Sequence, residues 1–73
     1  MDVIEVATKG RVPASEAWAF ARLDGGLYAF SYQDDDGNYL GRGHPSASLA
    51  REAAIEYAEG ERVRTLYWVK AVG

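Results

Sequence analysis

Two runs of alternating side chains flank the sequence Asp24-Gly25-Gly26. Residues 17–23 alternate alanine with larger side chains, and residues 27–33 alternate aromatic with smaller side chains. A period of two is the side-chain repeat of a β-strand. A glycine-rich turn between two such runs is a strong signal for a hairpin. The chain is therefore predicted to contain an antiparallel pair of strands against which the remaining elements pack.

The length of the hairpin loop decides which residues share a face of this pair. A two-residue loop places Phe30 opposite Ala21 or Ala19, whereas a three-residue loop pairs it with Phe20. We favour three residues, because Gly26 can take the left-handed position of a three-residue loop with a bulge. One face would then carry the aromatic residues Trp18, Phe20, Tyr28, Phe30 and Tyr32. The other face would be flat and open, with the small residues Ala17, Ala19, Ala21, Ala29 and Ser31.

A second turn is predicted at the acidic sequence Asp34-Asp35-Asp36-Gly37-Asn38. Asp36-Gly37 is a favoured pair for a type I′ turn, so a short return strand is expected from Asn38 to Gly43. In that register Tyr32 faces Gly41, and Phe30 faces Gly43. Aromatic rings would then cover bare glycine backbone, which is a known way to support a weak strand.

One helix is predicted over residues 49–59, which have an alanine-rich side and a stripe of glutamates. Ser46 or Ser48 can cap its first turn by accepting from an unpaired backbone N–H. Gly60 stands where a left-handed residue often ends a helix. The many alanines would let this helix lie close to large rings on a sheet.

Two further strands complete the expected fold. Residues 3–7 alternate as a short strand, and residues 63–72 form the longest run, with apolar groups on both faces as in a central strand. The fold class predicted from these elements is α+β, in a single domain over residues 1–73. It would hold an antiparallel sheet of three to four strands in the order β-β-β-(β)-α-β, with the helix packed on the aromatic face.

Composition excludes several classes of protein. The chain has 73 residues, no cysteine and one histidine, so neither a disulfide framework nor a zinc site is expected. The net charge of −3 disfavours non-specific binding to nucleic acid. The start of the chain has no basic region followed by a long apolar run, and no segment is apolar enough to span a membrane. These features favour a cytoplasmic protein that is not bound to a membrane.

The acidic turn has some of the spacing of a calcium loop. Asp34, Asp36 and Asn38 alternate as ligands would, but Gly37 lies between two of them, where the loop needs its glycine after the third. No glutamate follows before Glu52 to complete the ligand set. We therefore expect no metal site.

No residue set meets the requirements of an enzyme. His44 is the only side chain that titrates near neutrality without help, and it has neither a nucleophile nor an orienting acid assigned to it. The spacing of Gly37, Gly41 and Gly43 lacks the Lys-Ser/Thr ending of a phosphate-binding loop. The sequence predicts no enzymatic activity and no cofactor.

The acidic turn is either a solvated loop tip or a contact for a basic partner. Three adjacent carboxylates repel one another, and a partner with a basic surface would relieve that repulsion. Our first hypothesis is a small protein-binding module that uses this turn together with the open alanine-rich face. The residues predicted to contact the partner are Asp34, Asp35, Asp36, Asn38, Arg42, Arg62 and Arg64.

Two other hypotheses remain open at this stage. The basic residues Arg42, Arg62, Arg64 and Lys70, interleaved with aromatic residues, could serve a nucleic-acid-binding accessory protein. Alternatively, the chain could be a structural homo-oligomer, because so small a domain without disulfides or metals gains stability by burial between subunits.

The format of the whole chain, an acidic single-sheet miniature with no catalytic set, resembles small inhibitors encoded by phages and mobile elements, such as anti-CRISPR proteins. The resemblance lies in this format and not in a motif. It implies a target with a basic surface, often one built for nucleic acid, that is met by carboxylates such as those of Asp34, Asp35 and Asp36.

Overall fold

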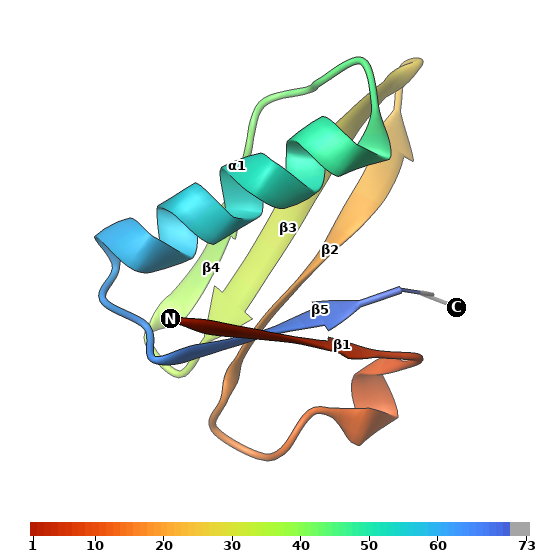
Figure 1. Cartoon of the computed structure of the whole chain (residues 1–73). Coiled ribbons are helices and arrows are strands. Elements are labelled where there is room, and N and C mark those ends of the chain that lie inside the picture. Colours follow the sequence, from red (N-terminus) through yellow and green to blue (C-terminus); the bar gives the residue numbers. More distant parts are fainter. Residues whose placement is uncertain (71–73) are drawn as a thin grey trace.

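The computed structural model describes residues 1–70 and confirms the α+β class, with one α-helix beside a five-stranded sheet (Figure 1). In chain order the elements are β1 (Asp2–Val6), the 3₁₀-helix η1 (Lys9–Arg11), β2 (Ala17–Asp24), β3 (Leu27–Asp34), β4 (Gly37–Leu40), α1 (Ala47–Gly60) and β5 (Thr65–Val69). The predicted extension of the last strand to Ala71 and Val72 lies outside the described residues.

The sheet is mixed and has the strand order β1-β5-β2-β3-β4, so the prediction of a purely antiparallel sheet of three to four strands is wrong. β5 runs parallel to both of its neighbours, β1 and β2, whereas β2, β3 and β4 form an antiparallel meander. The parallel part arises because α1 carries the chain back across the sheet to place β5 between the first two strands. The expectation that β5 is an interior strand with apolar residues on both faces is confirmed, because Leu66, Trp68 and Val69 are all buried.

The hairpin between β2 and β3 has a two-residue loop, and the three-residue prediction is wrong. Asp24 pairs with Leu27, which leaves Gly25 and Gly26 as the loop with φ angles of 60° and 84°. Two adjacent glycines take both left-handed positions at no steric cost. The resulting turn matches the twist of the strands.

This register divides the aromatic residues between the two faces of the sheet. Phe30 lies opposite Ala21, and Tyr32 lies opposite Ala19, on the face that α1 covers. Trp18 lies opposite Gln33 on the other face, which we call the far face. The predicted single aromatic face and the predicted open alanine-rich face are therefore both wrong.

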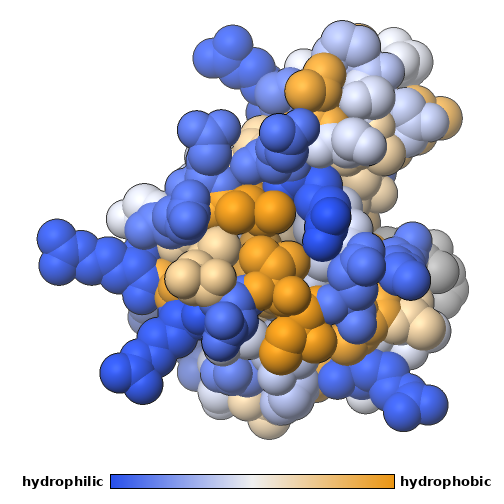
Figure 2. Space-filling view, viewed as in Figure 1, coloured by the Kyte–Doolittle hydropathy of each residue, from blue (hydrophilic) through white to orange (hydrophobic). Residues whose placement is uncertain are grey.

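Alanines instead form the contact between the helix and the sheet. Ala19 of β2 and the helix residues Ala50, Ala54 and Ala58 are fully buried, with Ala17 almost so. Because these side chains are so short, α1 lies directly on β2 and β3, and the large rings of β3 fill the space beside it. On this side of the molecule, apolar surface also gathers between α1 and the strands β1 and β5 (Figure 2).

α1 begins two residues before the predicted start at Leu49, and the first of the two predicted caps is confirmed. Ser46 caps the helix, with its Oγ accepting the backbone N–H of Leu49 at 3.2 Å. Gly60 is the last helical residue, and Arg62 takes the left-handed conformation (φ 61°) in its place. This geometry lets the N–H of Val63 donate to the carbonyl of Ala58, which leads the chain into β5.

The return strand β4 is displaced by two residues from the predicted register. Tyr32 pairs with Tyr39 instead of Gly41, and the N–H of Gly41 donates to the carbonyl of Phe30 at 2.9 Å. The Phe30 ring therefore covers Gly41 rather than Gly43. Glycine under an aromatic ring is confirmed as a device of this sheet, with a different pairing of residues. Among residues 1–70, no helix has the length and apolar character needed to cross a membrane.

Candidate binding site at the acidic end of the sheet

Asp34 closes the turn between β3 and β4 rather than pointing into water. It pairs with Gly37 at the end of the ladder, so the loop is Asp35-Asp36 and the predicted Asp36-Gly37 turn is wrong. One carboxylate oxygen of Asp34 accepts the backbone N–H groups of Asp36 (2.8 Å) and Gly37 (3.1 Å). The other oxygen accepts the hydroxyl of Tyr32 at 2.6 Å. A carboxylate that accepts backbone N–H groups two and three residues ahead stabilises a turn locally.

These hydrogen bonds favour the ionised form of the Asp34 carboxyl. The hydroxyl of Tyr32, aided by the two backbone N–H groups, lowers the pKa of the Asp34 carboxyl below its usual value, against an opposing effect of burial. Burial raises the pKa of the Tyr32 hydroxyl well above its usual value, and the bond to Asp34 adds to this shift. The pair is thus an ionised acceptor with a neutral donor.

Replacing Asp34 with asparagine is expected to destabilise the domain by about 1 kcal/mol at pH 7, because three hydrogen bonds lose their charged acceptor. The folded-state pKa of Asp34 is lowered, so its contribution is present above the unfolded value of about 3.9 and is lost as the pH falls through the folded value. The difference between wild type and Asp34→Asn in urea unfolding should therefore be large at pH 7 and small at the lowest pH at which both fold.

The matched control for this experiment is Asp36→Asn, which removes the same charge from the same turn. The side chain of Asp36 is exposed and accepts none of the described hydrogen bonds. Its variant should retain the acid dependence of the wild type. Equal destabilisation by Asp34→Asn at every pH would contradict the charged role of Asp34.

Two further carboxylates lie beside the acidic turn. A hollow of ≈ 510 Å³ is lined by the turn, by Glu16 from the segment that leads into β2, and by Glu61 from the end of α1. A smaller hollow of ≈ 110 Å³ places Asn38 and Tyr57 against the same turn and Glu61. We call the five residues Asp34, Asp35, Asp36, Glu16 and Glu61 the acidic end.

The sequence interpretation missed Glu16 and Glu61. Glu16 could have been found, because any antiparallel pairing of β2 with β3 brings the start of the first strand beside the end of the second. In the structure Trp18 pairs with Gln33, which puts Glu16 level with Asp35. Glu61 could not have been found in this way, since its position depends on where α1 ends above the sheet.

The predicted arginines do not form one surface. Arg62 and Arg64 line the hollow of the acidic end. Arg42 lies elsewhere, in a hollow of ≈ 450 Å³ with His44, Glu56 and the stacked rings of Tyr39 and Tyr57. The stripe that a nucleic-acid backbone would need is therefore divided, and part of it lies among carboxylates that repel phosphate.

Among residues 1–70, none of the carboxylates at the acidic end forms an ion pair, although Arg62 and Arg64 line the same hollow. Among residues 1–70 the only ion pair joins Arg51 and Glu5, 3.9 Å apart, between α1 and β1. In the same part of the chain, no three side chains of the metal-binding kinds lie close enough to hold an ion. No family model matches this chain, and neither does any curated protein or solved structure. The arrangement of these charges is thus the feature from which a function can be argued.

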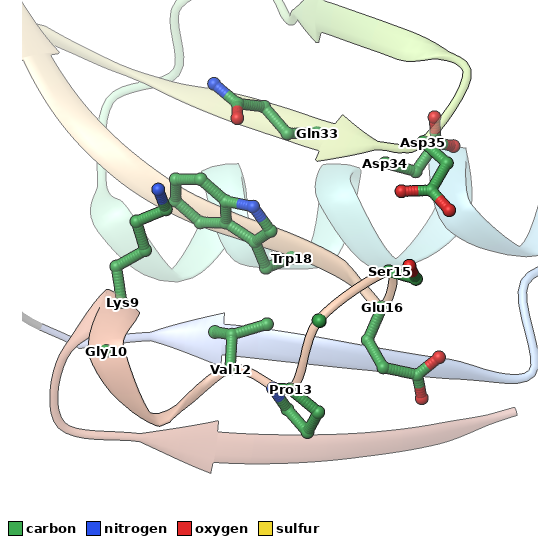
Figure 3. Close-up of a pocket in the computed structure, with 11 residues that line it drawn as sticks. Lys9, Gly10, Val12, Pro13, Ser15, Glu16, Trp18, Gln33, Asp34 and Asp35 are labelled. Carbon is green, nitrogen blue, oxygen red and sulfur yellow. The ribbon is translucent and has the colours of Figure 1, made fainter.

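A further hollow adjoins the acidic end on the far face of the sheet. It measures ≈ 360 Å³ and lies between the Trp18 ring and the segment that connects β1 to β2 (Figure 3). Glu16, Asp34 and Asp35 line it as well, so it shares three carboxylates with the ≈ 510 Å³ hollow of the acidic end. The ammonium of Lys9 lies over the Trp18 ring, 5.4 Å from its centroid. Neither Trp18 nor Lys9 was predicted as a site residue, because the wrong hairpin register placed Trp18 under the helix.

Proposed function

We propose that this protein is a non-enzymatic binding module that contacts a basic protein surface through its acidic end. One observation supports the proposal above the others. Five carboxylates from three separate segments surround one hollow and outnumber Arg62 and Arg64, which also line it. None of the five forms an ion pair with a cation of the described chain. Such an arrangement costs folding free energy through repulsion, and a basic partner would relieve that cost.

The shape of the acidic end suits contact with a folded partner. Asp35 and Asp36 are exposed at the tip, while Asp34 holds the tip in one conformation through its hydrogen bonds. A rigid tip loses little conformational entropy on binding, and its charge accelerates encounter with an oppositely charged surface. The alanine-rich face has no part in this proposal, because α1 covers it.

We further infer that the partner's surface is one that binds nucleic acid, and that the protein acts as a small inhibitor of a host defence complex. The support is the format that the chain shares with inhibitors encoded by phages, together with a carboxylate cluster that could occupy sites used by phosphates. Charge of this kind at a phosphate-binding surface competes directly with the nucleic-acid backbone.

The test compares two triple variants that remove the same charge. Asp35→Asn/Asp36→Asn/Glu16→Gln removes three of the five negative charges of the acidic end and keeps Asp34, which the turn needs. Asp24→Asn/Glu52→Gln/Glu56→Gln removes three exposed carboxylates from the opposite hairpin and from α1. Partners captured from the native host by the wild type are identified by mass spectrometry, purified, and titrated by calorimetry.

We expect the first variant to bind a captured partner about tenfold more weakly, at roughly 0.5 kcal/mol for each exposed charge pair. The second variant should bind within about twofold of the wild type, because its charges lie away from the contact. Equal weakening by both variants would reduce the effect to net charge and remove the acidic end as the binding surface. Undiminished binding by the first variant would also remove the acidic end as the binding surface.

A further inference from the structure

We propose that the hollow over Trp18 is a receptor for an arginine side chain of the basic partner, and that the ammonium of Lys9 covers the Trp18 ring in the free protein. This inference rests on the proposed function, since it assumes a basic partner at the acidic end. It adds a defined subsite with an aromatic floor, which a charged turn alone does not supply.

The floor of the hollow is the indole of Trp18 on the far face of the sheet. Trp18 lies in β2 between Tyr67 of β5 and Gln33 of β3, and it is partly exposed. Phe20 stacks beside it, with ring centroids 5.7 Å apart and planes 19° from parallel. The stacked ring of Phe20 therefore restricts the orientation of the indole, which faces the segment that connects β1 to β2 (Figure 3).

The opposite wall of the hollow is built from the connecting segment. Val12 and Pro13 supply apolar atoms on this wall, and Lys9 lies at one end of it. Such a wall suits the methylene stem of a long cationic side chain, whose charged head remains near polar groups. The shape thus fits an extended side chain better than a compact ion.

The position of Lys9 shows that the ring accepts a cation. Its ammonium lies 5.4 Å from the Trp18 centroid, within the range of a cation–π interaction. No carboxylate of the described chain lies within ion-pair distance of this ammonium, because the single ion pair there is Arg51 with Glu5. The indole is therefore the side chain of the described residues that contacts the ammonium of Lys9, which is otherwise exposed.

The carboxylates at the other end of the hollow favour arginine over lysine. Asp34 already accepts from Tyr32 and from the turn, so Asp35 and Glu16 are the acceptors that remain free of the described hydrogen bonds. A guanidinium can lie flat on an indole while its in-plane N–H groups donate to carboxylates at its edge. An ammonium cannot satisfy both contacts in this planar manner.

The experiment follows the indole N–H signals in a ¹⁵N–¹H correlation spectrum. The described chain has two tryptophans, Trp18 in the hollow and Trp68 in the core at 7% exposure, and the variant Trp18→Phe assigns the two signals. The probe is an acetylated, amidated Gly-Arg-Gly-Arg-Gly peptide, titrated to millimolar concentration at low salt. The same peptide with citrulline in place of arginine is the neutral control. We expect a saturable shift of the Trp18 signal with arginine only, and no shift of Trp68.

Two variants test the role of Lys9 as the resident cation. Lys9→Gln frees the ring and should tighten binding of the arginine peptide by about two- to fivefold, the equivalent of an exposed cation–π contact. Arg11→Gln removes the same charge from the same 3₁₀-helix but does not line the hollow, so it should change the affinity less. An equal gain from both variants would overturn the displacement of Lys9.

The failure of this inference can be distinguished from the failure of the proposed function. If the arginine peptide shifts the backbone signals of Asp35 and Asp36 but does not shift the indole N–H signal of Trp18, the subsite is wrong and the acidic end still binds. If no signal moves with arginine, or if citrulline moves Trp18 as strongly, the arginine receptor is overturned. The proposed function is judged separately, by the partner affinities of the two triple variants.

Discussion

Replacing Gly41 with alanine is expected to destabilise the domain by about 3 kcal/mol, at the upper end of the cost of overpacking a core. A Cβ on Gly41 would stand 2.2 Å from Cε1 and 2.5 Å from Cδ1 of the Phe30 ring. The ring cannot move away freely, because Phe30 is only 4% exposed and lies against Tyr39 and Tyr57. The backbone of Gly41 is also tied to Phe30 by a hydrogen bond. Urea unfolding followed by circular dichroism measures the loss.

The control for this experiment is Gly10→Ala in η1. Its Cβ would meet only Thr8 Oγ1 at 3.7 Å, which is an ordinary contact, and Gly10 has no positive φ. An exposed substitution of this kind changes stability by about 0.5 kcal/mol or less. If Gly41→Ala were as mild as Gly10→Ala, the contact between Phe30 and bare backbone would not be a support of the sheet.

The hairpin shows what local sequence could and could not predict. Asp24-Gly25-Gly26 correctly indicated two antiparallel strands, but it is compatible with a loop of two residues or three. The deciding factor is distant in sequence, because the two-residue register brings Ala19 under α1, where Ala54 is also fully buried. Cross-strand pairing of aromatic residues favoured the three-residue loop locally. The close packing of α1 on the sheet favours the two-residue loop that the structure has.

The parallel strands were beyond local reasoning for a similar reason. Nothing within β1 or β5 specifies that they lie side by side, since their pairing depends on the path of α1 across the sheet. Parallel strands need a connection that crosses over, and the segment between β1 and β2 is shorter than usual and has no α-helix. It is this crossing segment that forms the wall above Trp18.

The candidate site was predicted in part. A turn was correctly predicted within residues 34–38, because three adjacent carboxylates beside a glycine are unusual, but its two loop residues were placed one position too late. Its internal structure was missed, although period-two alternation puts Tyr32 and Asp34 on one face and aspartate commonly binds the backbone of a turn. The Trp18 hollow followed from the register and could not be predicted without it.

Replacing Leu66 with alanine is expected to lower the free energy of unfolding by about 3 kcal/mol, within the range for substitutions that leave a cavity where a leucine side chain was buried. Leu66 is fully buried in β5, level with Val3 of β1 and Ala17 of β2. Its side chain therefore joins the edge strand to the meander under the end of α1. The free energy of unfolding of a domain of this size is about 4 to 11 kcal/mol, so the variant would lose a large part of its stability.

The matched control is Leu23→Ala, which removes the same atoms from a residue that is 63% exposed beside the β2–β3 turn. We expect it to cost about 0.5 kcal/mol or less, because little area leaves water there on folding. Leu66→Val should fall between the two, at about 1 kcal/mol, and provides a measurable value if Leu66→Ala does not fold. The three midpoints in urea thus order the variants by burial. Equal losses for Leu66→Ala and Leu23→Ala would mean that β5 is not held by this core, and the wall and floor of the Trp18 hollow would then have no fixed separation.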